Sequence, residues 1–186
     1  MSSTRSILVT IAQTVLNALT SRTSRPSRRP GRSGVVVPES HATAPAARSG
    51  TQTVRLDPDR LSDLEISYAP DRDGTPDAGE IVWTWVPYEE NDGRGKDRPV
   101  LVIGRESKNR VYAVRMTSKA HDGDRDFLSI GTGEWDSQGR ESWVDIEQLY
   151  SVHDDGMRRE AAVLGRSLFD RVAASLTRRY GWASLG

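Results

Sequence analysis

Residues 80–86 (EIVWTWV) and 98–104 (RPVLVIG) decide the fold class of this chain. The first stretch alternates large β-forming side chains on both faces, and the second holds an apolar run from Val100 to Ile103. Short apolar runs rich in Val and Ile are typical of strands that are covered on both faces. Pro99 fits the first position of the second strand, where a missing backbone donor is tolerated. The two stretches therefore predict two well-buried strands.

The segments that follow predict more strands and a terminal helix. A polar loop spans residues 88–97, and residues 108–110 (KNR) make a tight turn into the next strand. The further strands are expected over residues 111–116, 127–130 and 142–146. Ser167 with Asp170 matches a capping box, and Gly181 can end the helix that it starts. Five short strands with a C-terminal helix predict a mainly β domain built as a small barrel-like sheet.

The residues before this region predict a leader with little structure. Residues 1–20 place apolar side chains at helical spacing, which predicts a short amphipathic helix that is too short to span a bilayer. Residues 21–50 are rich in Ser, Arg, Pro, Ala and Gly, and residues 51–78 are acidic with several prolines. Such compositions bury too little apolar surface to offset the entropy of ordering. We expect a disordered linker over residues 21–78, first basic and then acidic, before a folded domain over residues 79–183.

Composition narrows the possible classes of function. The net charge is zero over 186 residues, so any contact with a polyanion must come from local clustering of basic groups. Residues 1–50 hold seven arginines against one glutamate, a net charge of +6. The chain has no cysteine, which excludes a disulfide, a thiolate zinc site and a cysteine nucleophile, and fits a reducing cytoplasm. Its three histidines lack metal-ligand spacing, so we expect no structural metal.

Three patterns that suggest other chemistries are incomplete. Residues 93–96 (GRGK) lack the four residues between glycines, and the hydroxyl after lysine, of a phosphate-binding loop. Ser118 has His121 nearby, but no nucleophile elbow or orienting acid marks a serine hydrolase. The carboxylates interpreted as solvated surface groups rather than a catalytic pair are Glu134, Asp136 and Asp145.

An ordered set of motifs carries the functional signal. The motifs are Gly79-Glu80-Ile-Val-Trp, Gly95-Lys96-Asp97-Arg98-Pro99-Val-Leu-Val-Ile, Met116-Thr117-Ser118-Lys119, Trp135 with Gly139-Arg140, and Trp143-Val-Asp-Ile-Glu147. In order and spacing they resemble the PemK/MazF family of toxins, and the resemblance covers residues 79–182. It implies a small SH3-like barrel of the PemK/MazF/CcdB type that forms a homodimer and cleaves single-stranded RNA without metal or cofactor. It also implies neutralisation by a co-encoded antitoxin protein, and DNA binding through the antitoxin complex.

The resemblance assigns two catalytic positions and leaves a third open. The catalytic arginine of the family falls on Arg98, and its strand-end threonine falls on Thr117. RNA cleavage without metal needs a base for the 2′-hydroxyl, an acid for the leaving 5′-oxygen, and positive charge at the phosphorane oxygens. A guanidinium stays charged and matches phosphate oxygens, which fits Arg98. His121 is the first candidate for the base because its unperturbed pKa lies near neutrality, with Glu89 and Glu90 as rivals.

Other side chains are expected to hold the RNA or the core. Backbone-phosphate contacts are expected from Lys119, Arg115 and Arg140, and a stacking platform for bases from Trp85 or Tyr88. The tryptophans interpreted mainly as core or dimer-interface residues are Trp83, Trp85, Trp135 and Trp143. Glu147, just before Gln148, matches an acidic position of the family. The resemblance leaves its role open between structure and catalysis.

Two hypotheses of function remain open. The first is a metal-independent endoribonuclease toxin. The second is a non-catalytic barrel that acts as an interaction module, toward a gyrase subunit or within an antitoxin–operator complex. The 78 residues before the first motif admit four interpretations: a basic arm for RNA, a membrane-surface anchor, a regulatory segment, or a start codon called too early.

Overall fold

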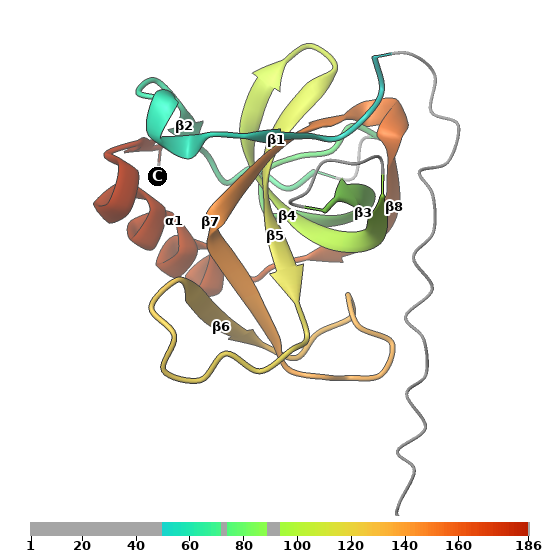
Figure 1. Cartoon of the computed structure of the whole chain (residues 1–186), viewed down its shortest axis with the longest axis vertical. Helices are drawn as coiled ribbons and strands as arrows, with labels where there is room; N and C mark the ends of the chain where they lie inside the picture. The colour runs from blue at the N-terminus through green and yellow to red at the C-terminus, as the bar shows by residue number, and fades with distance from the viewer. Residues whose placement is uncertain (1–49, 72–73, 89–93, 186) are drawn as a thin grey trace, which may run out of the picture. The chain divides into compact units, whose positions relative to one another are not determined.

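The computed structural model describes residues 50–71, 74–88 and 94–185. Its centre is an antiparallel sheet in the order β1-β7-β5-β4-β3-β8, with β6 also paired to β7 (Figure 1). The strands are β1 (Val54–Leu56), β2 (Glu65–Ile66), β3 (Glu80–Pro87), β4 (Gly95–Ser107), β5 (Arg110–Thr117), β6 (Phe127–Gly131), β7 (Ser142–His153), β8 (Met157–Val163) and β9 (Ala183–Ser184). The helices are the 3-10 turns η1 (Pro58–Arg60) and η2 (Asp154–Gly156) and the α-helix α1 (Arg166–Tyr180). The predicted β-rich fold with a C-terminal helix is confirmed, and the narrower SH3-like assignment stays a prediction.

Strand β4 is buried on both faces, as its apolar run predicts. The four residues from Val100 to Ile103 are all 0% exposed. The strand begins at Gly95 rather than at Arg98, so Pro99 lies inside it and not at its first position. Pro99 pairs with β3, while pairing with β5 starts only at Val100. A proline is tolerated there because one edge of the strand is still unpaired.

Strand β7 extends beyond the predicted residues 142–146, because a bulge interrupts the sequence pattern without ending the strand. Val114 and Arg115 are neighbours in β5, but their partners in β7 are Leu149 and Asp145. Three residues of β7 therefore lie between the partners of two adjacent residues of β5. A bulge of this kind bends a strand and interrupts the regular alternation of side chains. The expected strand over residues 142–146 therefore continues past the bulge to His153.

Helix α1 ends as predicted but begins differently. Gly181 has a φ of 76° and donates its backbone N–H to Thr177, which closes the helix. The start is at Arg166, with a glycine as N-cap and no side-chain cap, so the expected capping box of Ser167 and Asp170 is wrong. Asp170 instead accepts a hydrogen bond from Arg166 at 2.8 Å.

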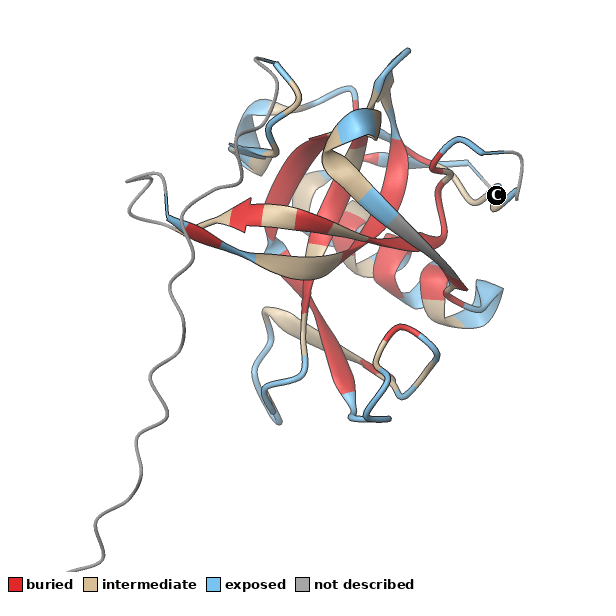
Figure 2. Ribbon diagram, turned by 90° about the vertical axis from the view of Figure 1, so that its right-hand side faces the viewer, coloured by how far each residue is buried: buried red, intermediate tan, exposed pale blue. Residues whose placement is uncertain are grey.

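The apolar face of α1 lies against the sheet, where the buried residues gather (Figure 2). The buried residues of this face are Phe169, Val172, Ala173 and Leu176. Tyr68 packs on Phe169 with ring centroids 5.0 Å apart. Neither α1 nor any other helix in the described residues is long and apolar enough to cross a membrane.

The described residues just before β3 are part of the fold, which corrects the disorder expected over residues 51–78. β1 pairs with β7, and β2 pairs in parallel with β9 at the other end of the chain. Leu64 is 2% exposed and Ile66 is 0% exposed. The indole Nε1 of Trp182 donates to the Leu61 carbonyl at 2.5 Å. The few apolar residues of this acidic stretch are therefore buried by strand pairing and packing with residues far along the chain. The helix expected over residues 1–20, and the linker up to residue 49, lie outside the described residues.

Candidate active site

Arg98 and Thr117, which we call the candidate pair, lie on neighbouring strands at the same end of the sheet. Arg98 is on β4 opposite Thr84 of β3, and Thr117 is the last residue of β5. The two strands pair in one register from Val100↔Arg115 to Val102↔Ala113, and the register shifts after Val102. Continuing this register by two residues places Arg98 across from Thr117, on the same face. Directly opposite residues of antiparallel strands have Cβ atoms about 4.5–5.5 Å apart. The extended register therefore brings the guanidinium and the hydroxyl to the same end of the sheet, and both side chains are half-buried.

The hydroxyl of Thr117 is held by the turn that follows β5. Its Oγ1 accepts a hydrogen bond from the backbone N–H of Lys119 at 3.1 Å. This local bond fixes the position of the oxygen at the strand end. A hydroxyl that accepts one bond still has its own proton to donate. Thr117 can therefore donate a hydrogen bond to an anionic ligand from a fixed position.

Arg115 forms a partly buried ion pair on the same face. Its Nη2 lies 2.5 Å from Oδ2 of Asp145, whose side chain is 3% exposed. The other carboxylate oxygen accepts the backbone N–H of Glu147 at 3.1 Å. Asp145 is thus not the solvated surface group that its sequence context suggests, because β5 and β7 bring it opposite a guanidinium. The Nε of Arg115 is buried and has no hydrogen-bond partner in the described residues, so this guanidinium keeps a donor to spare.

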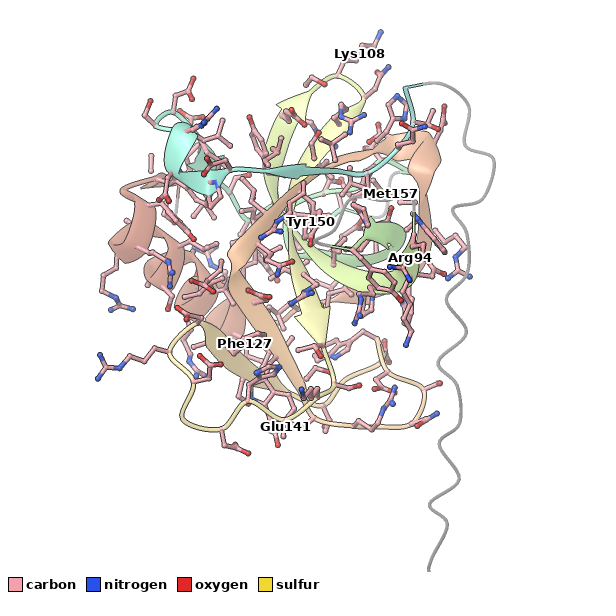
Figure 3. All side chains as sticks on the ribbon, viewed as in Figure 1. Arg94, Lys108, Phe127, Glu141, Tyr150 and Met157 are labelled. Atoms are coloured by element: carbon pink, nitrogen blue, oxygen red, sulfur yellow. The ribbon has the colours of Figure 1, made fainter. Side chains whose placement is uncertain are left out.

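Tyr150 and Gln148 add a buried polar pair beside the arginines. The Tyr150 hydroxyl donates to Oε1 of Gln148 at 2.5 Å, and both residues are buried. Burial raises the pKa of Tyr150 above its ordinary value of 10.0, while the charges of Arg115, Arg55 and Arg98 oppose that rise. Three guanidinium groups therefore lie within electrostatic reach of one hydroxyl. Tyr150 is near the middle of the sheet, and Phe127 is toward its lower end in Figure 3.

His121 lies over the face of the Arg115–Asp145 ion pair, through its contact with Phe127. Its ring stacks on Phe127 with centroids 3.5 Å apart and an angle of 7°. Its Nδ1 is 3.6 Å from Oδ2 of Asp124. Phe127 pairs with Asp145, which pairs with Arg115, so the stacked ring belongs to the face of the ion pair. In the described part of the chain, no hydrogen bond joins the imidazole to the candidate pair. Its role as the base stays a prediction.

The other expected RNA-contacting residues, Arg140, Lys119 and Tyr88, differ in exposure and in the contacts that hold them. Arg140 donates from Nε to Asp136 at 2.8 Å, and this hydrogen bond is the main reason that the pKa of Asp136 is lowered. The side chain of Lys119 is exposed. Tyr88 is half-buried, and its backbone N–H bonds the Arg94 carbonyl at 3.0 Å. Tyr88 and Arg94 thereby close the base of the loop between β3 and β4.

Each of the remaining candidate residues either forms an ion pair elsewhere in the fold, packs in or near the core, or lies outside the described residues. Asp97, the sequence neighbour of Arg98, pairs with Arg158 of β8, because adjacent residues of a strand face opposite sides. Glu147 pairs with Arg179 of α1 at 2.5 Å. The rival bases at positions 89 and 90 lie outside the described residues. Of the four tryptophans expected in the core or at a dimer interface, Trp135 and Trp143 are buried, whereas Trp83 and Trp85 are half-buried.

Sequence reasoning missed the residues that surround the arginines. Gln148 lies in the bulge of β7, where side-chain alternation is interrupted, so the sequence held no reliable signal that its side chain meets Tyr150. Arg55 lay in the expected linker and carried no signal. In the part of the chain that the structure describes, no three His, Asp or Glu side chains gather to hold a metal ion.

Comparisons with known proteins identify the family. The family model described as "PemK-like, MazF-like toxin of type II toxin-antitoxin system" matches residues 77–179, more than half of the 186-residue chain. A search of curated proteins gave no match. Among solved structures, the chain is similar to MazE-MazF (Form-II) from Deinococcus radiodurans, with 20% identity, 57% of this chain and 96% of that chain covered, and a TM-score of 0.45. It is similar to an endoribonuclease in complex with its cognate antitoxin from a mycobacterial species, with 15% identity, 57% and 95% covered, and a TM-score of 0.43. It is also similar to the Mycobacterium tuberculosis toxin MazF-mt6, with 15% identity, 54% and 97% covered, and a TM-score of 0.39. On the extent of the family match, this chain belongs to the PemK-like, MazF-like toxins of type II toxin–antitoxin systems.

Proposed function

We propose that the chain is an endoribonuclease that cleaves single-stranded RNA without a metal ion, with Arg98 and Thr117 at the cleaved phosphate. Membership of the toxin family supports the class of reaction. The proposal is supported by the register of β4 and β5, which when extended by two residues would set Arg98 across from Thr117, and by the hydrogen bond that holds the Thr117 hydroxyl. A fixed cation with a hydrogen-bond donor beside it suits the charge that develops on a phosphorane.

The reaction begins with attack of the ribose 2′-oxygen on the adjacent phosphorus. The 2′-hydroxyl gives up its proton to a base, a new P–O2′ bond forms, and the P–O5′ bond breaks. Arg98 neutralises the non-bridging oxygens and donates a hydrogen bond toward the leaving 5′-oxygen. Thr117 donates its hydroxyl proton in a hydrogen bond to a non-bridging oxygen. The products are a 2′,3′-cyclic phosphate and a 5′-hydroxyl, the latter completed by a proton from an acid or from water.

His121 is the proposed base for the 2′-hydroxyl. Its stacking on Phe127 and its approach to Asp124 hold the imidazole over the face of the Arg115–Asp145 ion pair. A base of this kind loses activity as pH falls and the ring becomes protonated. A rate that falls on acidification in the wild type but not in His121→Gln would support the assignment, whereas an unchanged pH profile in the variant would exclude it.

The other parts of the proposal concern partners. An antitoxin protein neutralises the chain, the active form is a homodimer in the cytoplasm, and DNA is bound through the antitoxin complex. The support is the type II toxin–antitoxin family. Co-expression with the neighbouring open reading frame, followed by co-purification and size-exclusion chromatography, tests these parts together.

Cleavage is tested with purified protein and a long single-stranded RNA in the presence of EDTA. We expect discrete fragments that end in cyclic phosphate. Arg98→Ala should abolish cutting while the fold is retained, and Arg171→Ala, which removes an exposed arginine of α1, should cut normally. Undiminished cutting by Arg98→Ala would refute the site. Tight binding of a protein partner without any RNA cleavage would instead favour the interaction module.

A further inference from the structure

Strand β1 brings a residue from outside the family-matched region to the candidate active site. The matched region starts at residue 77, whereas β1 covers Val54–Leu56. Figure 1 shows β1 running across the sheet beside β7. Arg55 is directly opposite Tyr150 of β7, and Tyr150 is opposite Ala113 of β5. Directly opposite residues share a face. Arg55 therefore lies on the face that holds Arg115, two residues beyond Ala113 on the same strand.

β1 is held in place by several specific bonds. Arg110 donates to the carbonyls of Gly50 at 3.0 Å and Gln52 at 2.9 Å. The hydroxyls of Thr53 and Thr84 are 2.6 Å apart, and Thr84 is the residue opposite Arg98 on β3. The backbone just before Arg55 is thus attached both to β5 and to the strand beside the candidate pair.

The charge of Arg55 is available to a ligand. Its side chain is exposed, and in the described residues it makes no ion pair or hydrogen bond. By contrast, Arg115 is paired with Asp145. An exposed guanidinium next to other cations favours a ligand that carries several regularly spaced negative charges.

We propose that Arg55 binds a backbone phosphate of single-stranded RNA beside the cleaved phosphate, so that β1 extends the substrate-binding surface of the toxin domain. This inference rests on the proposed ribonuclease function. Arg55 is assigned to binding and not to the chemical step. A phosphate contact adds affinity without sequence preference and weakens as salt rises.

Binding is tested with the full chain and a fluorescent 2′-O-methyl oligoribonucleotide, which lacks the attacking hydroxyl and cannot be cleaved. Arg55→Ala should weaken the affinity roughly three- to ten-fold, and should lower the slope of log affinity against log salt by about 0.7, the value for one phosphate on a single strand. Arg55→Lys should recover most of the affinity. Arg60→Ala is the matched control, because Arg60 is an exposed arginine of the same segment that pairs with Asp57. With cleavable RNA, the defect of Arg55→Ala should fall mainly on KM.

The outcomes separate this inference from the function on which it rests. If the wild type cleaves RNA and Arg55→Ala binds with unchanged affinity and salt slope, the inference is overturned and the function stands. Equal losses in Arg55→Ala and Arg60→Ala would also overturn it, because they would show only a general charge effect. If Arg55-dependent binding is found without cleavage, the inference holds and the ribonuclease fails. A wild type that neither binds nor cleaves single-stranded RNA refutes both.

Discussion

Replacing Ile66 with alanine should destabilise the whole domain, because the segment before β3 is part of the core. Ile66 is 0% exposed, and its strand β2 pairs with β9. The change removes three buried carbons, and at about 0.8 kcal/mol each their transfer contributes about 2.4 kcal/mol. Incomplete collapse of the cavity adds to this, so the expected loss in the free energy of unfolding is about 2–5 kcal/mol.

Urea unfolding of the full chain, followed by tryptophan fluorescence and circular dichroism, measures this loss. The midpoint should fall with little change in the m value, since the mutation leaves the extent of the folded unit unchanged. Val54→Ala is the control, because Val54 belongs to the same segment but is 48% exposed, and its loss should stay below about 1 kcal/mol. A loss below about 1 kcal/mol for Ile66→Ala would refute the packing of this segment.

Three further predictions concern the polar groups around the candidate site. Asp145→Asn should lower the free energy of unfolding by about 1–3 kcal/mol, because it leaves Arg115 without its buried counter-charge; a urea midpoint equal to that of the wild type would contradict this. Burial raises the pKa of Tyr150, so the folded state keeps its proton longer than the unfolded chain. Stability should therefore hold below about pH 10 and fall as pH rises through the folded pKa, and Tyr150→Phe should flatten that fall in denaturation curves. Arg179→Ala releases Asp126 and Glu147, so hydrogen exchange should speed up around residues 124–127 while stability changes by less than about 1 kcal/mol; unchanged exchange would show that the ion pairs do not hold the loop.

The strands could be predicted where their apolar side chains are local and regular. Val100 to Ile103 form a continuous run, and each of them is buried. β8 could not be predicted in this way, because residues 157–160 (MRRE) carry the charges of a surface segment, and only pairing with β3 makes them a strand. The same holds for β2, where two residues are ordered by a partner more than a hundred positions away. Nonlocal pairing leaves little trace in the sequence around a short strand.

The sequence could predict the candidate-site residues that lie within single motifs, but not the contacts that form between distant strands. Arg98 and Thr117 come from motif positions, and the register of two long strands brings them to one end of the sheet. The ion pair between Arg115 and Asp145 depends on a bulge in β7, which a regular pattern of alternation cannot anticipate. Arg55 was hidden for another reason, since the composition around it resembles that of a chain without structure.

The parallel pairing of β2 with β9 has a consequence for the order of events during synthesis. Ile66 is made early, yet its carbonyl accepts the N–H of Leu185 at 2.8 Å, and its strand partner is Ser184. More than a hundred residues separate the two strands, so the pairing forms only after that whole stretch has been translated. Contacts of such long sequence separation also form late because their loops are costly to close. The domain therefore cannot be completed before the segment that carries β9 has been synthesised, although most of its sheet lies earlier in the chain.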